Sequence, residues 1–202
     1  VKNEETIDHK LVLTVIKRLI GIKNIDLNRH SQNHTLLTYA CQNNDLELVK
    51  MLIESEKVDI NSYAPQSGFT PLMIAIDKNN MEIAKLLIES PRCNINISNY
   101  MKETALTIAV NNNRSEIVSL LIKNQKFDPI ESRLDYAFFI SKGVIPKLLA
   151  SLTKLDVNLR DSICLETPLI HAVKSNNINK CRLILNHESF DPIKSQSKLA
   201  VF

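Results

Sequence analysis

The chain has 202 residues, of which 44% are hydrophobic and 23% are charged, and its 25 basic and 22 acidic residues leave a net charge of +3. A charge this balanced excludes a nucleic-acid-binding protein that works by neutralising many phosphates. No apolar run reaches the roughly 18 residues that a membrane-spanning helix needs, so we expect no membrane insertion. The length suits one globular domain or one short array of repeats.

The cysteines favour a reducing compartment. They are Cys41, Cys93, Cys164 and Cys181, and no two of them form a C-x-x-C pair. Cys41 and Cys181 fall on apolar positions of expected helices, where a thiol packs as a small hydrophobic group. The N-terminus lacks the charged and apolar stretches of a signal peptide. We therefore predict a cytoplasmic protein without disulfides.

One pattern, Thr-x-Leu-x-x-Ala, recurs along the chain. It begins at Thr35, Thr70, Thr104 and Thr167, and a weaker copy begins at Ser132. An apolar pair follows eleven residues after the alanine of each copy, and an Asp or Asn follows seven residues after that pair. Because the same order of residues recurs at nearly constant spacing, the chain is predicted to be an array of repeats.

The register of the pattern divides the chain into repeats at about 1–30, 31–65, 66–99, 100–129, 130–162 and 163–192, with a partial repeat at 193–202. Each full repeat is expected to hold two short amphipathic helices followed by a loop. The partial first repeat is predicted to keep a helix over about residues 11–20. One short helix pair cannot bury its apolar face alone, so stability should come from stacking.

This pattern resembles the ankyrin repeat family. The stretches Thr70-Pro71-Leu72 and Thr167-Pro168-Leu169 match the turn that opens the first helix, and residues 82–87 and 116–121 match the second helix. The Thr can cap free backbone N–H groups, and Pro is tolerated at the next position. The resemblance implies an all-α fold, an ankyrin-type α-solenoid of stacked antiparallel helix pairs with short hairpin-like loops, in a single array over residues 1–202.

The turn between the two helices departs from the family pattern, which usually places Gly there. With only three glycines in the chain, the turn positions hold Asn44, Asn79, Asn113, Ser141 and Asn176. Asn adopts the left-handed conformation more readily than other non-Gly residues, so we expect these turns to form.

The repeat at 130–162 is the odd one. The connection that leads into it is short, and Pro146 lies near the start of its second helix. We predict that it is a weak link in the array. In the following repeat, Lys180 takes the position of Ile83 and Ile117, which predicts a more exposed outer edge or poor packing of the next repeat.

No catalytic or metal-binding pattern is present. The five histidines are scattered over different repeats, and the sequence has no H-E-x-x-H, no Gly-rich phosphate loop and no zinc-spaced Cys/His set. The recurring loop Asp residues are interpreted as turn formers. We predict no enzymatic activity, no cofactor and no metal.

The resemblance implies that partners dock on the concave side, formed by loop tips and the solvent face of the first helices. By register, the candidate surface comprises Phe69, Asp77, Lys78, Tyr100, Met101, Glu103, Asn111, Asn112, Phe139, Ile140 and Lys174. Neighbouring positions are Gln32, His34, Gln42, Asn43, Ser67, Glu166 and Ser175. Phe69, Tyr100 and Phe139 are the predicted anchors. Alternatively, Phe69 packs under its hairpin and Phe139 fills the gap left by the short connection.

These observations predict a protein–protein interaction scaffold, a monomer that binds partner proteins and no nucleic acid. A second hypothesis is that the chain is the regulatory segment of a larger enzyme, channel or signalling protein. It is motivated by a sequence that begins at Val1 instead of Met and ends at Phe202 within a repeat.

Overall fold

The computed structural model describes residues 9–31, 33–161 and 165–196. The contacts divide the chain into two compact parts, residues 1–93 and residues 94–202, which we call the N-terminal half and the C-terminal half. The boundary falls inside the expected repeat at 66–99. The single array over residues 1–202 therefore stays a prediction, and each half is described by itself.

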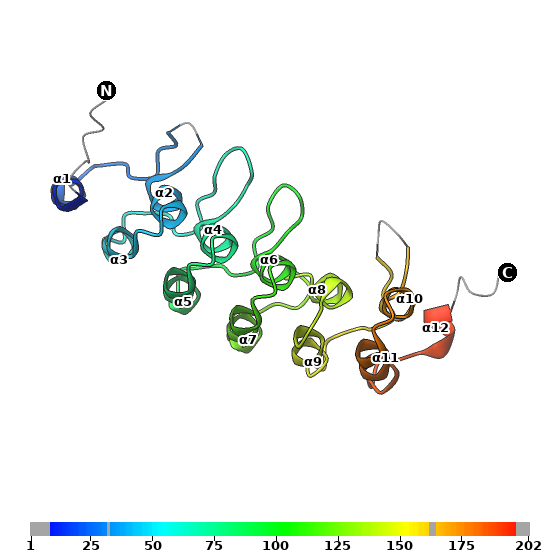
Figure 1. The fold of residues 1–202 in the computed structure, drawn as a ribbon. Helices are drawn as coiled ribbons and strands as arrows, with labels where there is room; N and C mark the ends of the chain where they lie inside the picture. Colours follow the sequence, from blue (N-terminus) through cyan, green and yellow to red (C-terminus); the bar gives the residue numbers. More distant parts are fainter. Residues whose placement is uncertain (1–8, 32, 162–164, 197–202) are drawn as a thin grey trace, which may run out of the picture. The chain divides into compact units, whose positions relative to one another are not determined.

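The N-terminal half consists of short helices in two layers. Its helices are α1 (His9–Gly21), α2 (Leu36–Gln42), α3 (Leu46–Glu54), α4 (Pro71–Asp77) and α5 (Met81–Glu89). Helix α2 pairs with α3 and α4 pairs with α5, while α2 lies beside α4 and α3 beside α5 (Figure 1). The helix expected over residues 11–20 is confirmed within α1.

The C-terminal half repeats this arrangement. Its helices are α6 (Ala105–Asn111), α7 (Ser115–Lys123), α8 (Leu134–Ile140), α9 (Ile145–Leu149), α10 (Pro168–Lys174), α11 (Ile178–Leu185) and α12 (Pro192–Gln196). Helices α6, α8 and α10 follow one another in one layer, and α7, α9 and α11 do so in the other (Figure 1). The described residues form helices and isolated bridges but no strands, which confirms the all-α prediction.

The apolar residues of the pattern form the core of each half. The pattern alanines, Ala40, Ala75, Ala109, Ala137 and Ala172, are all fully buried. The second helices are buried through one member of each apolar pair, namely Leu52, Leu87, Leu121, Leu149 and Ile184. A small side chain at the alanine position lets the two helices of a repeat approach closely, which is why this position does not vary.

Threonine starts the first helices as predicted. The hydroxyl oxygens of Thr35, Thr70, Thr104 and Thr167 each accept a hydrogen bond from the backbone N–H three residues later. Pro71 and Pro168 occupy the first helical position, where no intrahelical N–H is needed. Helix α8 lacks this cap, because Arg133 stands in the capping position in the left-handed conformation.

We expect Thr104→Val to lower the free energy of unfolding by about 1–2 kcal/mol. Valine keeps the shape but loses the bond from Thr107 N–H (3.2 Å) and the bond to the Ser132 carbonyl (2.9 Å). Urea denaturation measures the loss. The exposed Thr153→Val is the matched control and should change stability by less than about 0.5 kcal/mol. Equal effects of the two substitutions would contradict the cap.

The turns between paired helices take the left-handed conformation at asparagine. The φ angles of Asn44, Asn79, Asn113 and Asn176 are 56°, 60°, 54° and 53°, which confirms the prediction for these four. Ser141 does not follow it, because its backbone is extended (φ −65°, ψ 145°) and Gly143 takes the left-handed conformation instead. The turn after α8 therefore differs from the others.

A second asparagine, two residues after the recurring loop Asp or Asn, braces successive repeats. In the N-terminal half, Asn28 Nδ2 donates to the Lys57 carbonyl (3.1 Å) and its Oδ1 accepts from Asp59 N–H (2.6 Å). In the C-terminal half, Asn96 makes the same two bonds, to the Lys126 carbonyl and from Asp128 N–H. The complete set is Asn28, Asn61, Asn96 and Asn158. We did not predict this brace, although the recurrence of Asp/Asn-x-Asn in the sequence is a usable signal.

The odd repeat lacks the brace asparagine and replaces it from a helix. Ile130 occupies the brace position and is 87% exposed. Asp135, near the start of α8, accepts the bond from Asp156 N–H (3.1 Å) in its place. Burial is the main cause that raises the pKa of the Asp135 carboxyl. Helix α8 thus supplies an acceptor that the other repeats take from a loop.

Lys180, whose presence at this position suggested a more exposed outer edge or poor packing of the next repeat, is itself buried. Its side chain is only 2% exposed, and its Nζ donates to the carbonyl oxygens of Phe138 (2.7 Å), Phe139 (2.7 Å) and Ser141 (3.1 Å). A cation at a helix C-terminus also interacts favourably with the helix dipole. Burial, with a smaller effect of the Lys142 charge, lowers the pKa of Lys180 to about 8. At pH 7 the amine is still protonated, so it has a donor for each carbonyl.

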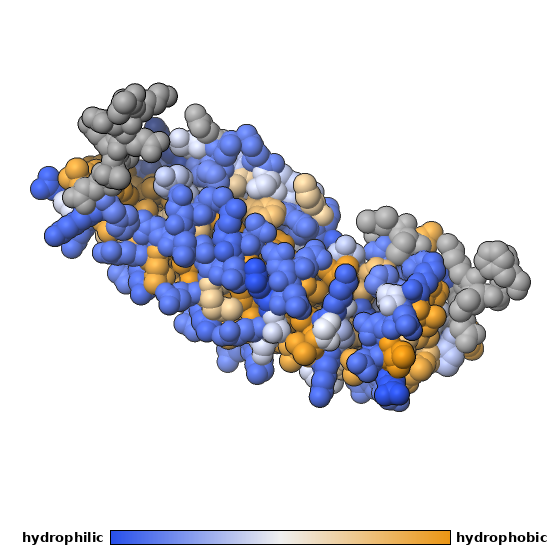
Figure 2. All heavy atoms as spheres, in the orientation of Figure 1, coloured by the Kyte–Doolittle hydropathy of each residue, from blue (hydrophilic) through white to orange (hydrophobic). Residues whose placement is uncertain are grey.

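The outer edge of the repeat at 163–192 is nevertheless more exposed, as predicted. Val173 is 63% exposed, whereas Ile76 and Val110 at the equivalent position are 0% and 4% exposed. Ile178 and Leu185 on α11 are also exposed, and Figure 2 shows hydrophobic surface over this helix. The exposure comes from these apolar residues and not from Lys180.

Candidate protein-interaction surface

The hairpin before α6 presents an aromatic side chain and a methionine on a fixed backbone. Asn99 is buried, and its Oδ1 accepts from Met101 N–H (2.9 Å) and Glu103 N–H (2.8 Å). The backbone N–H of Asn99 donates to the Glu103 carbonyl (2.8 Å). Tyr100 and Met101, at the tip, are 61% and 76% exposed. Because the loop is already held in place, a partner that contacts these side chains needs to order little backbone.

Four other candidates in the C-terminal half are either exposed or help to hold the fold. Glu103 is half-buried and accepts from Asn99 Nδ2 (2.8 Å), so it helps to hold the hairpin. Asn111 is exposed at the last residue of α6, and Asn112 is the half-buried capping residue that follows. Lys174 is exposed at the end of α10 and forms an ion pair with Glu166.

Phe139 is buried, which corrects its prediction as an exposed anchor. It is 8% exposed, and its ring centroid lies 4.7 Å from that of His171 on α10 and 6.4 Å from that of Tyr136. The alternative expectation, that Phe139 fills the space left by the short connection, agrees with this packing. Ile140 is half-buried. Little of the Phe139 side chain is accessible to a partner.

In the N-terminal half, the candidates lie at the hairpin before α4 and at the end of that helix. Phe69 is half-buried, and its carbonyl accepts from Ala64 N–H (2.9 Å) within the hairpin. Its own N–H donates to Ser67 Oγ (3.2 Å). Asp77 and Lys78 are exposed. Phe69 is therefore only partly accessible to a partner, whereas Asp77 and Lys78 are exposed.

Two exposed tyrosines in this half were not predicted. Tyr39 is 55% exposed and Tyr63 is 48% exposed. Tyr39 stands at the position of Ile74, which is 4% exposed. The available signal was a tyrosine at the position that Ile74 and Ile108 hold in the next two repeats. Of the neighbouring positions named from the register, Gln32 lies outside the described residues.

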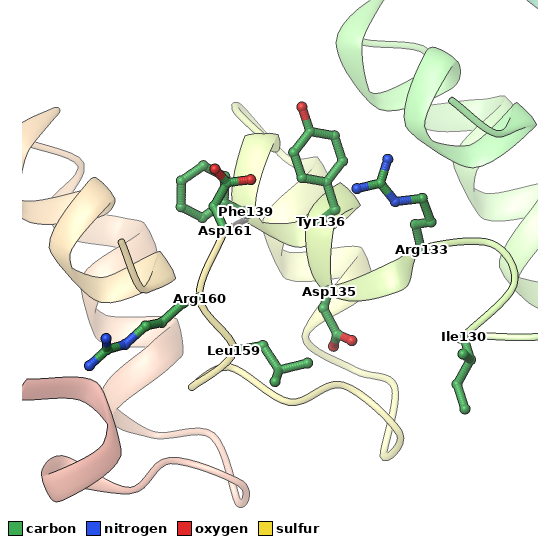
Figure 3. A pocket seen from close by; sticks show the side chains of 8 residues that line it. All are labelled: Ile130, Arg133, Asp135, Tyr136, Phe139, Leu159, Arg160 and Asp161. Carbon is green, nitrogen blue, oxygen red and sulfur yellow. The ribbon is translucent and has the colours of Figure 1, made fainter. Parts of the chain in front are cut away.

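A cavity of about 250 Å³ lies beside the first turn of α8 (Figure 3). Its lining comprises Ile130, Arg133, Asp135, Tyr136, Phe139, Leu159, Arg160 and Asp161. The segment 124–133 before α8 is shorter than the hairpin segments 90–104 and 150–167 that precede α6 and α10, which leaves this space open. The Arg133 guanidinium lies 4.5 Å from the Tyr136 ring centroid and donates to the Lys102 carbonyl (2.6 Å). Arg133 thus links the start of α8 to the hairpin before α6, across the space that the short connection leaves.

The described residues offer little for catalysis. They contain no group of three or more His, Cys, Asp or Glu that could hold a metal ion. Burial raises the pKa of the Cys41 thiol to about 12, so it stays protonated and unreactive at neutral pH. Within the same described residues, none of the helices has the length and apolar character needed to cross a membrane. Cys164 lies outside these residues.

Residues 9–99 match the model of the ankyrin repeat family in three copies. This part of the chain therefore consists of ankyrin repeats. No curated protein matches it. Ankyrin repeats are generally protein–protein interaction modules and are typically non-catalytic.

The ankyrin pattern also accounts for helices that follow residue 99. Helix pairs α6–α7 and α10–α11 have a capping Thr, a buried alanine and a left-handed Asn in the turn, as the matched pair α4–α5 does. The pair α8–α9 keeps the buried Ala137 but lacks the Thr cap and the Asn turn. The expected repeat at 130–162 therefore departs from the pattern in the structure as well.

Proposed function

We propose that this chain is a non-catalytic scaffold that binds a partner protein through its hairpin tips and the exposed ends of its first helices. The observation that supports this most is the hairpin held by Asn99, which exposes Tyr100 and Met101 side by side. Aromatic residues and methionine are enriched at protein interfaces. The described residues contain no group of three or more His, Cys, Asp or Glu that could hold a metal ion.

The proposed surface in the C-terminal half consists of Tyr100, Met101, Asn111 and Lys174, all exposed. In the N-terminal half it consists of Asp77 and Lys78, with the half-buried Phe69 at its edge. Glu103, Asn112 and Ile140 are half-buried and would contribute at the rim. Phe139 is left out of the proposed contacts because it is buried.

The test is a double substitution, Tyr100→Ala with Met101→Ala. A partner captured by the wild-type chain and identified by mass spectrometry should bind the double variant about thirtyfold more weakly, a loss of about 2 kcal/mol. Isothermal titration measures the affinity, and circular dichroism checks that the helices are intact.

The matched control is Ile178→Ala with Leu185→Ala, which removes two exposed apolar side chains from α11 instead. This control should retain full affinity. If the α11 variant loses as much binding as the hairpin variant, or if neither loses any, the hairpin is not the binding surface.

A further inference from the structure

A second cavity, of about 420 Å³, opens between three successive first helices of the C-terminal half. Its lining comprises Val110, Asn111, Asn113, Ile140, Lys142 and His171. These residues come from the end of α6 and its turn, the end of α8 and its turn, and α10. The cavity therefore lies on the layer that carries the proposed interaction surface.

The lining of this cavity is basic. Lys142 is exposed, and its charge lowers the pKa of both His171 and Lys180, so three basic groups share one small region. Among the described residues that line the cavity, none is Asp or Glu. The Lys180 ammonium is held by three carbonyls and cannot turn away.

The acidic groups nearby offset this charge only in part. Glu166 and Asp161 act on the pKa of His171 in the opposite direction to the lysines, and the effect of Glu166 is smaller than that of Lys180 but larger than that of Lys142. Glu166 is ion-paired with Lys174. Neither acid lines the cavity, so Lys142 is the charged side chain that an anionic group from outside would meet at its wall.

The protonation state of His171 would change if such an anionic group bound in the cavity. Its Nδ1 is buried and makes no hydrogen bond with the described residues, and its ring is held against Phe139 at 4.7 Å. Burial, followed by the Lys180 charge, lowers the pKa of the imidazole. The ring is therefore neutral at pH 7. An anion placed in the cavity would favour the protonated ring, because an opposite charge stabilises the charged form.

We propose that this cavity binds the carboxylate of an aspartate or glutamate of the partner protein, with Lys142 and His171 as its main contacts. The proposal rests on the interaction function proposed above. Lys142 supplies the charge, and the amides of Asn111 and Asn113 are further donors at the rim. Hydrogen bonds between charged partners are about twice as strong as neutral ones, so a carboxylate is preferred over an amide of the same shape.

The test uses the full chain and two short peptides, blocked at both ends, that contain a single glutamate or a glutamine in its place. In NMR titrations, the glutamate peptide should shift the His171 imidazole signals and raise the pKa of His171, and the glutamine peptide should do neither. Lys142→Gln should weaken binding of the glutamate peptide about tenfold. The control is Lys147→Gln, since Lys147 is exposed on α9 and does not line the cavity.

Three results would overturn this site: equal binding of the two peptides, equal losses in the two lysine variants, or no change at His171 with the glutamate peptide. Partner binding by the Tyr100→Ala, Met101→Ala variant is measured separately. If that variant loses its partner while the peptides fail, the carboxylate site alone is wrong. If the peptides bind as expected while the hairpin variant keeps its partner, the hairpin surface alone is wrong.

Discussion

Replacing Lys180 with methionine should lower the free energy of unfolding by about 3 kcal/mol. The ammonium donates to the carbonyls of Phe138, Phe139 and Ser141, and methionine leaves them without this donor in a buried site. After α4, Ile76 O corresponds to Phe138 O and accepts from Asn79 N–H (3.1 Å). Phe138 O likewise accepts from Ser141 N–H (3.2 Å) and Ser141 Oγ (2.6 Å), in addition to Lys180 Nζ. The extended Ser141 and the left-handed Gly143 make this turn differ from the turn after α4. Urea denaturation and hydrogen exchange in α8 measure the effect.

Two further variants make the Lys180 experiment decisive. Lys180→Ile introduces the residue type found at Ile83 and Ile117, both fully buried. It should be destabilised to a similar degree, because the three carbonyls still lose the ammonium that donates to them. Lys147→Met, at an exposed site on α9, should stay within about 0.5 kcal/mol of the wild type. A Lys180→Ile variant as stable as the wild type would show that the position needs only an apolar side chain.

Replacing Asn96 with alanine should cost about 2–3 kcal/mol. Asn96 is 8% exposed, its Nδ2 donates to the Lys126 carbonyl (2.7 Å), and its Oδ1 accepts from Asp128 N–H (3.1 Å) and Ser132 Oγ (2.6 Å). The substitution removes three bonds that join the loop before α6 to the connection before α8. Thermal and urea unfolding monitored by circular dichroism should both show the loss.

The exposed amide Gln125, in the same connection, provides the control for Asn96. Gln125→Ala should change stability by less than about 0.5 kcal/mol. Hydrogen exchange adds a local test, since the Asp128 N–H should exchange faster in Asn96→Ala than in the control. Unchanged protection of that N–H would mean that the brace does not hold the connection.

Much of the fold could be predicted because the signals are local. A threonine caps the helix that it precedes, proline fits the first helical position, and asparagine adopts the left-handed turn, as Thr70, Pro71 and Asn79 do within ten residues of one another. Local chemistry of this kind repeats wherever the residues repeat. The register that it sets also placed Tyr100 and Met101 at an exposed hairpin tip.

The candidate surface was predictable only where the repeats are regular. Phe139 aligns with Asp77 and Asn111, which are both exposed, so the register alone places it on the surface. It is buried because the preceding connection is short and His171 of the next repeat packs on its ring. The burial of a residue in an irregular repeat depends on its neighbours in space, and the pattern does not carry that information.

The sequence by itself determined the repeat, the helix pairs, their starts and their turns, because each follows from residues close together in the chain. The tertiary structure alone decided how the irregular repeat is held. Lys180 reaches carbonyls 39 to 42 residues earlier in the chain, and Asp135 bonds to a backbone N–H 21 residues later. These contacts form only when stacked helices bring distant residues together. Their donors and acceptors do not recur at the repeat spacing, so the sequence pattern does not predict them. The same stacking gathers Lys142 and His171 around the cavity proposed to bind a carboxylate.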